Sequence, residues 1–243
     1  MEEHRYLHEM LPFMKLVDKE RQEQLEEYFH TAPLWLLDAL QVEQVPAGTT
    51  FIRENAPADT IIFVGKGRAK ATDYRISGVA FDFMKLESNI ALGGMEVLMD
   101  LKTYQTTWRT ESECILIKLP RSQYEKWLFS DLEAFRLEAK LTCYSLLEEG
   151  RRNRLYLFLQ GADRLAFLFV EWFEKFSQND SLNIRESRMG MADETGLCLK
   201  SVSRAVKKFA DEGLITKYGN QININRKQYE GLRQMVDCKI DRA

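Results

Sequence analysis

A cluster of basic side chains near the C-terminus has the residue types and spacing to bind nucleic acid. They lie on one side of a predicted helix from about Cys198 to Glu212: Lys200, Arg204, Lys207 and Lys208. The other side has the i, i+3, i+4, i+7 spacing of a buried face: Val202, Ala205, Val206 and Phe209. Arginine and lysine donate hydrogen bonds to guanine edges and neutralise phosphates. A basic helix face alone is usually only solvated, so the elements on either side of the helix are needed to show whether it binds nucleic acid.

The residues before and after this helix predict a winged helix-turn-helix. Gly196 lies where two short helices would meet, and glycine adopts the left-handed conformation that such a turn requires. After the helix, Ile215–Tyr218 and Gln221–Ile224 flank a Gly219-Asn220 turn and predict a β-hairpin. We therefore expect this part of the chain to bind double-stranded DNA.

The N-terminal half of the second helix is expected to enter the major groove. Lys200, Ser201 and Arg204 are the candidates for base contacts, with Arg204 placed for a bidentate contact to guanine. Leu199 either contacts a thymine methyl or shields the start of the helix. The candidates for phosphate contacts are Lys207, Lys208 and Lys217.

Charge and composition separate the two ends of the chain. The 243 residues carry a net charge of −3, but residues 181–243 hold 12 Lys and Arg against 8 Asp and Glu (net +4), which leaves net −7 for residues 1–180. We expect no signal peptide, because the start Met1-Glu2-Glu3-His4 has no basic segment before an apolar run, and no membrane span, because the apolar stretch Leu155–Val170 contains Asp163 and Arg164. The four cysteines are too scattered for a disulfide framework. We expect a cytoplasmic protein that does not bind membranes.

The remaining sequence predicts an α+β protein with a sensor domain in residues 1–130, a long helix in 131–160 and a DNA-binding domain in 161–243. Residues 13–42 read as helical with a break at Pro33, and short β-type runs between turns follow from Val42 to Leu119. Two stripes of residues run along the long helix.

One stripe is expected to pair two chains: Ala139, Thr142, Leu146, Asn153 and Tyr156. The other is expected to pack on the helix's own domain: Leu137, Leu141 and Tyr144. A buried helix in a monomer is the alternative, and a hinge is expected near Gly161.

Over residues 12–230 the chain resembles the Crp/Fnr family of bacterial transcriptional regulators. The resemblance lies in the segment Pro46–Asp59, the run Gly65–Lys70, Arg164-Leu165-Ala166, and Gly196–Ile215. It implies a jelly roll of the cyclic-nucleotide-binding type, a dimerisation helix and a winged helix-turn-helix. It also implies a homodimer on a near-palindromic DNA site, a small-molecule effector, and RNA polymerase as a candidate partner.

The sequence departs from the family in the region of the effector site. The resemblance places that site at Gly93, Gly94, Met95, Glu96, Tyr104, Gln105, Thr106 and Glu149. Cyclic-nucleotide binders of the family carry Gly-Glu and Arg-Ser pairs where this chain has Gly93-Gly94 and Tyr104-Gln105. Without the arginine, the desolvated cyclic phosphate lacks a counter-charge, so we expect an effector other than cyclic AMP. At the start of the reading helix, Cys198-Leu199-Lys200-Ser201 replaces the family's Ser-Arg-Glu-Thr, so the preferred bases should differ.

Other classes of function find little support. The three histidines, His4, His8 and His30, all precede the β region, which therefore lacks the imidazoles that a metal-dependent cupin enzyme needs. We predict no catalytic site, no metal and no cofactor. A redox- or haem-responsive regulator on the same scaffold is the alternative, through Cys198 at a helix N-terminus or through the pair His4 and His8.

Overall fold

The computed structural model describes residues 11–75, 79–85, 90–219 and 221–240. The chain forms two compact units, one of residues 1–73 and 82–147 and one of residues 148–243 together with 74–81. The boundary between Leu147 and Glu148 falls inside the longest helix, α6 (Leu132–Phe158). Neither α6 nor any other helix in the described residues has the length and apolar character to cross a membrane.

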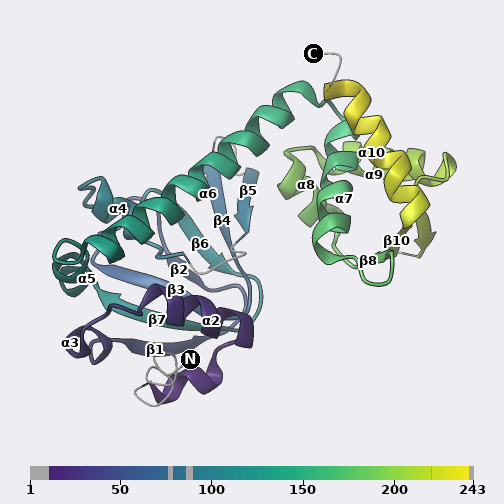
Figure 1. Cartoon of the computed structure of the whole chain (residues 1–243). Coiled ribbons are helices and arrows are strands. Elements are labelled where there is room, and N and C mark those ends of the chain that lie inside the picture. The colour runs from purple at the N-terminus through teal and green to yellow at the C-terminus, as the bar shows by residue number, and fades with distance from the viewer. Residues whose placement is uncertain (1–10, 76–78, 86–89, 220, 241–243) are drawn as a thin grey trace. The chain divides into compact units, whose positions relative to one another are not determined.

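The first unit is built on two antiparallel sheets (Figure 1), except that residues 74–81 at one end of the second sheet are grouped with the second unit. One has the order β1-β7-β3, with bounds Gln41–Val45, Cys114–Pro120 and Thr60–Lys66. The other has the order β2-β6-β4-β5, with bounds Thr50–Ile52, Thr107–Thr110, Ala69–Arg75 and Val79–Lys85. These elements confirm the predicted β domain.

Strand β3 reads as one apolar run because both of its faces are buried. Ile61 and Phe63 point to a core shared with the N-terminal helices, whereas Ile62 and Val64 point to a core shared with the second sheet. The helices of this unit are η1 (Pro12–Leu16), α2 (Lys19–Tyr28), α3 (Leu34–Leu37), α4 (Gly94–Leu98) and α5 (Arg121–Leu128). Strand β1 starts at Gln41 and pairs with β7, so the predicted helical segment 13–42 is shorter and more broken than expected.

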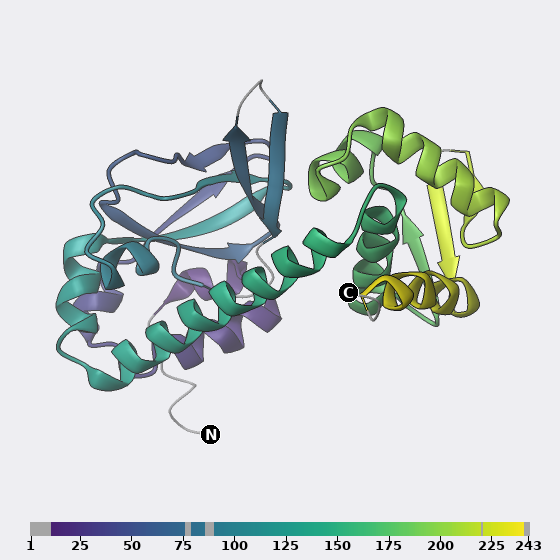
Figure 2. The ribbon, with the colours of Figure 1, turned by 90° about the horizontal axis from the view of Figure 1, so that it is seen from above.

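The second unit is a winged helix with one additional helix. Its helices are α7 (Ala162–Phe176), α8 (Arg188–Thr195), α9 (Leu199–Asp211) and α10 (Arg226–Ile240). Its sheet has the order β8-β10-β9, with bounds Ser181–Ile184, Gln221–Asn225 and Thr216–Tyr218. The hairpin was predicted, but strand β8 and helix α10, into which β10 leads directly, were not (Figure 2). Helix α10 packs on α7, where the Tyr229 ring stacks on Phe173 at 4.5 Å between centroids.

Candidate DNA-binding surface and effector site

The turn between α8 and α9 is fixed by local hydrogen bonds and one glycine. Ser187 caps the start of α8, where its hydroxyl accepts a hydrogen bond of 2.9 Å from the Gly190 amide. At the other end, Gly196 adopts a left-handed conformation with φ of 66°, which confirms the predicted role of this glycine. The adjacent Thr195 hydroxyl donates a 2.7 Å hydrogen bond to the Met191 carbonyl. These contacts set the angle at which α9 leaves the turn.

Helix α9 is held by its apolar face. Val202, Ala205, Val206 and Phe209 are all buried, as their spacing predicts. Phe209 meets Phe169 of α7 edge-to-face at 6.3 Å, and Met191 of α8 is fully buried in the same core. The orientation of α9 about its own axis is therefore determined by the core, and the basic side must face away from it.

The basic side chains of α9 are exposed, but they differ in their partners. Lys200, Arg204 and Lys207 have no ion-pair partner among the residues that the structure describes. Lys208 lies 3.9 Å from the Glu212 carboxylate, so part of its charge is compensated. The structure thus brings the three free cations together on one helix face, which is the arrangement required to approach a polyanion.

The other predicted contact residues occupy different settings. Leu199 is 45% exposed at the start of α9, and Lys217 is exposed on β9. Ser201 is half-buried, and its hydroxyl lies 3.2 Å from the Cys198 Sγ atom. Tyr218, next to Lys217 and 68% exposed, was not singled out from the sequence.

Cys198 is expected to react faster with iodoacetamide near neutral pH than Cys143, which is also exposed. The Ser201 hydroxyl and backbone amides at the start of α9 stabilise the thiolate and lower the pKa of Cys198. Mass spectrometry of the labelled peptides measures both rates in one sample. Ser201→Ala should slow the labelling of Cys198 and leave Cys143 unchanged, whereas equal rates in the wild type would contradict the assignment.

The predicted effector residues on α4 and the following loop form one tightly bonded cluster. Gly93 has φ of 103°, and the Tyr104 hydroxyl donates to the Thr60 carbonyl. The Gln105 amide donates to Glu96 Oε1 at 3.0 Å. Met95 and Thr106 are half-buried in the same region of the sequence, and Glu149 lies on α6 beyond the boundary between the units. The acceptors in this cluster are the Thr60 carbonyl and the Glu96 carboxyl, and none of the predicted effector residues described here is a lysine or arginine that could bind a phosphate.

Arg121, the first residue of α5, is the buried cation next to this cluster. Its guanidinium donates to the backbone carbonyls of Leu101 at 2.6 Å and Ala58 at 3.3 Å. Its Nε atom donates to Glu125 Oε1 at 2.6 Å. These bonds use Arg121 to tie the α4 loop to the sheet, so it does not replace the arginine that is missing at position 104.

A carboxylate from α6 takes up the space beside Gly94. A Cβ atom placed on Gly94 would lie 2.1 Å from Glu138 Oε1, so no side chain fits there without moving Glu138. Glu138 accepts hydrogen bonds from the Tyr28 hydroxyl at 2.6 Å and the Thr142 hydroxyl at 3.1 Å. The Tyr124 hydroxyl lies 2.6 Å from that of Tyr28. A buried carboxylate of the long helix therefore occupies the space that a side chain at position 94 would need.

Glu138→Gln is expected to make the free energy of unfolding depend less on pH. Burial raises the pKa of the Glu138 carboxyl above its ordinary value, and the hydrogen bonds offset this only in part. Between the ordinary and the raised pKa the folded state binds a proton that the unfolded state has lost, so stability falls as pH rises. Urea unfolding over a pH series should show the stability of the variant, relative to wild type, rising with pH and then levelling off. Glu113→Gln at an exposed position is the control. If the stability of Glu138→Gln relative to wild type fell as pH rose, the raised pKa of Glu138 would be refuted.

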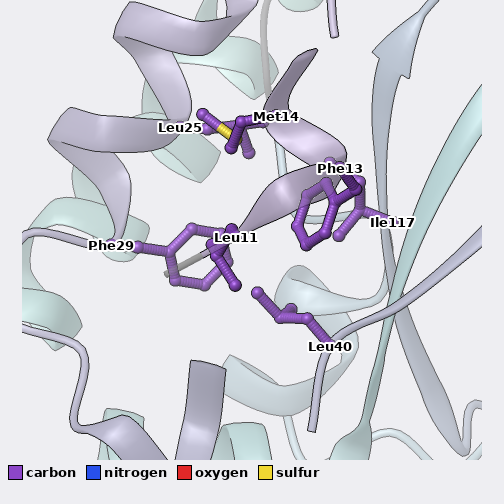
Figure 3. A pocket seen from close by; sticks show the side chains of 7 residues that line it. All are labelled: Leu11, Phe13, Met14, Leu25, Phe29, Leu40 and Ile117. Carbon is purple, nitrogen blue, oxygen red and sulfur yellow. The ribbon is translucent and has the colours of Figure 1, made fainter. Parts of the chain in front are cut away.

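An apolar pocket lies elsewhere in the first unit, between η1, α2 and strand β7. Figure 3 shows Leu11, Phe29 and Leu40 directed toward one another, and the remaining lining residues are Phe13, Met14, Leu25 and Ile117. Its volume of about 10 Å³ is close to the space of one water molecule. A volume of this size is that of a packing gap between side chains.

The chain is similar to known regulators over most of its length. A family model for the Crp-like helix-turn-helix domain matches residues 163–235. The cAMP-activated global transcriptional regulator CRP of Haemophilus influenzae is 21% identical over 192 residues, which cover 77% of this chain and 85% of that protein. The c-di-GMP responsive regulator CLP of Xanthomonas campestris has a TM-score of 0.70 at 20% identity, over 84% of this chain and 99% of that one. A regulator of the Crp/Fnr family from Eubacterium rectale also has a TM-score of 0.70, at 15% identity, over 93% and 99%.

Proposed function

Because the chain is a transcriptional regulator of the Crp/Fnr family, we propose that it binds double-stranded DNA as a homodimer and that a small molecule other than cyclic AMP controls this binding. The observation that carries the proposal is the face of α9, where three uncompensated cations stand on a helix whose other side is locked into the core. A winged helix presents such a face to the major groove, and Lys217 on the wing would bind the adjacent phosphates.

The homodimer is supported by an uncovered apolar stripe on α6. Leu132 is 82% exposed, and Phe135 and Leu146 are exposed on the same side, with Ala139 and Thr142 between them. Their alternating three- and four-residue spacing is that of a helix that packs against another helix. Leu137 and Leu141 of the other stripe pack on the first unit as predicted, whereas Tyr144 is exposed. Tyr156, which was predicted for the pairing stripe, instead packs on the core of the second unit, where its ring meets Phe167 edge-to-face at 5.4 Å. Two copies joined along the stripe from Leu132 to Leu146 would read two half-sites of a near-palindromic sequence.

The nature of the effector is constrained by charge. Glu96 and Glu138 are buried near the expected site, and Arg121 is occupied by backbone carbonyls. A cyclic phosphate placed there would meet carboxylates and no free guanidinium, which is unfavourable in a desolvated site. RNA polymerase is proposed as the further protein partner. The redox alternative rests on Cys198, whose pKa is lowered at the start of α9, because His4 and His8 lie outside the described residues.

The test is selection from random duplexes with the full-length protein, with and without cyclic AMP or a cell metabolite extract. We expect a symmetric enriched sequence, a binding constant that falls steeply with salt, and no effect of cyclic AMP. If no sequence is enriched under any of these conditions, or if binding is independent of salt, the proposed function is wrong.

A further inference from the structure

Helix α10 begins with two reciprocal hydrogen bonds between Asn225, which precedes it, and Gln228 in its first turn. The Gln228 backbone amide donates to Asn225 Oδ1, and the Asn225 backbone amide donates to Gln228 Oε1, both at 3.0 Å. This is the geometry of a capping box, and it uses only the oxygen of the Gln228 side-chain amide. The side-chain nitrogen of Gln228 therefore remains available for other acceptors.

That nitrogen binds two acceptors outside α10. Gln228 Nε2 donates to the Gly213 carbonyl at 3.2 Å and to the Thr216 hydroxyl at 2.9 Å. Gly213 follows the end of α9 and has φ of 73°, and Thr216 is the first residue of β9. One half-buried side chain thus joins the end of α9, the start of β9 and the start of α10.

A glycine of α10 lies close to the same connection between α9 and β9. A Cβ atom placed on Gly231 would lie 2.8 Å from Leu214 Cδ2, so a larger residue at this position would displace Leu214. Gly231 follows Gln228 by about one helical turn and therefore lies on the same side of α10. Helix α10 thus contacts the α9–β9 connection at two points, through hydrogen bonds at Gln228 and through close packing at Gly231.

Strand β9, which forms the wing together with β10, needs such support. It has three residues and is the outer strand of the described sheet, next to β10. Its central residue is Lys217, which is exposed and is the predicted phosphate contact. A cation on a loosely held strand must be ordered when DNA binds, which lowers the affinity, whereas a strand that is already held in place avoids this loss.

We propose that Gln228 is a positioning residue for DNA binding. It holds β9 at a fixed place relative to the end of α9, so that Lys217 and the cations of α9 form one preorganised surface. This inference rests on the proposed function, because it concerns the same DNA-binding surface. It gives α10 a role in DNA binding beyond its packing on α7.

The experiment measures the binding of full-length variants to the duplex that the wild type selects. Gln228→Met keeps the length of the side chain and removes its donors, so we expect binding that is about three- to tenfold weaker. Gln234→Met is the matched substitution at an exposed position of α10 and should bind like the wild type. Asn225→Ala removes one bond of the capping box but keeps the Gln228 donors, so it should weaken binding less than about twofold.

Lys217→Ala distinguishes a positioning role from a general loss of structure. If Gln228 acts through Lys217, the two substitutions are coupled, and Gln228→Met should weaken binding less than about twofold once residue 217 is alanine. Equal fold-losses in both backgrounds, or wild-type affinity of Gln228→Met, overturn the inference and leave the proposed function intact. Failure of the wild type to select any sequence overturns the proposed function and the inference with it.

Hydrogen exchange followed by mass spectrometry tests the role of Gln228 in the absence of DNA. The backbone amides of β9 should exchange about tenfold faster in Gln228→Met than in the wild type, because two hydrogen bonds that hold the strand are lost. Exchange in α8 should stay at the wild-type rate, which shows that the variant is folded. Unchanged exchange in β9 would overturn the inference, since Gln228 would then not be what holds the strand.

Discussion

Replacing Leu132 and Leu146 by glutamate should yield a monomer that binds a two-half-site duplex about a thousandfold more weakly than the wild type. Both leucines are exposed on one side of α6, and a carboxylate there would have to be buried without a counter-charge in a helix pair. A monomer also loses the high effective concentration of its second reading helix, which is worth about a hundredfold to ten-thousandfold in affinity. Analytical ultracentrifugation and fluorescence anisotropy measure the two effects.

Tyr144→Glu is the matched control for this prediction. Tyr144 is 61% exposed on the same helix but belongs to the other stripe, so the same type of substitution should leave a dimer with normal affinity. A double variant of Leu132 and Leu146 that remains dimeric would show that the chains associate through another surface. A wild-type protein that is monomeric on its DNA site would rule out the homodimer altogether.

The parts of the molecule that depend on local sequence were predictable. The turn at Gly196 and the buried face of α9 follow from a glycine and a four-residue apolar pattern, and the structure has both. Helix α6 was expected from Asp131 to Leu159 and runs from Leu132 to Phe158, because no proline or strong turn signal occurs between these ends.

Features that depend on distant pairing were missed or misplaced. The start of β1 lies inside a segment that reads as helical, and it is a strand because it pairs with β7 about seventy residues away, from Gln41 opposite Lys118 to Val45 opposite Cys114. Strand β8 has only four residues and gains its partners from β10. Helix α10 carried a signal that could have been read, since its buried residues Tyr229, Leu232 and Val236 have helical spacing.

The candidate effector site likewise has features that local sequence predicts and features that depend on contacts between distant parts of the chain. The sequence shows Gly94 and Tyr104 at the positions where the resemblance predicts the charged residues of cyclic-nucleotide binders. It could not reveal that Glu138 occupies the space beside Gly94 or that Arg121 binds the carbonyls of the α4 loop, because both contacts join elements far apart in the chain. The predicted base and phosphate contacts stay predictions, and so does the predicted division of the chain into domains.

Phe209→Ala should lower the free energy of unfolding of the second unit by about 3–5 kcal/mol, the usual cost of removing a buried aromatic ring. Phe209 is fully buried against Phe169, and it is the largest of the four buried residues through which the core fixes the rotation of α9. Calorimetry should show a lower transition for the second unit and an unchanged one for the first, together with loss of specific DNA binding at temperatures where the second unit has unfolded. Phe176→Ala, which removes a ring that is 55% exposed on α7, should have a much smaller effect. If Phe209→Ala were as mild as Phe176→Ala, the core would not be what orients Lys200 and Arg204, and their outward position would need another explanation.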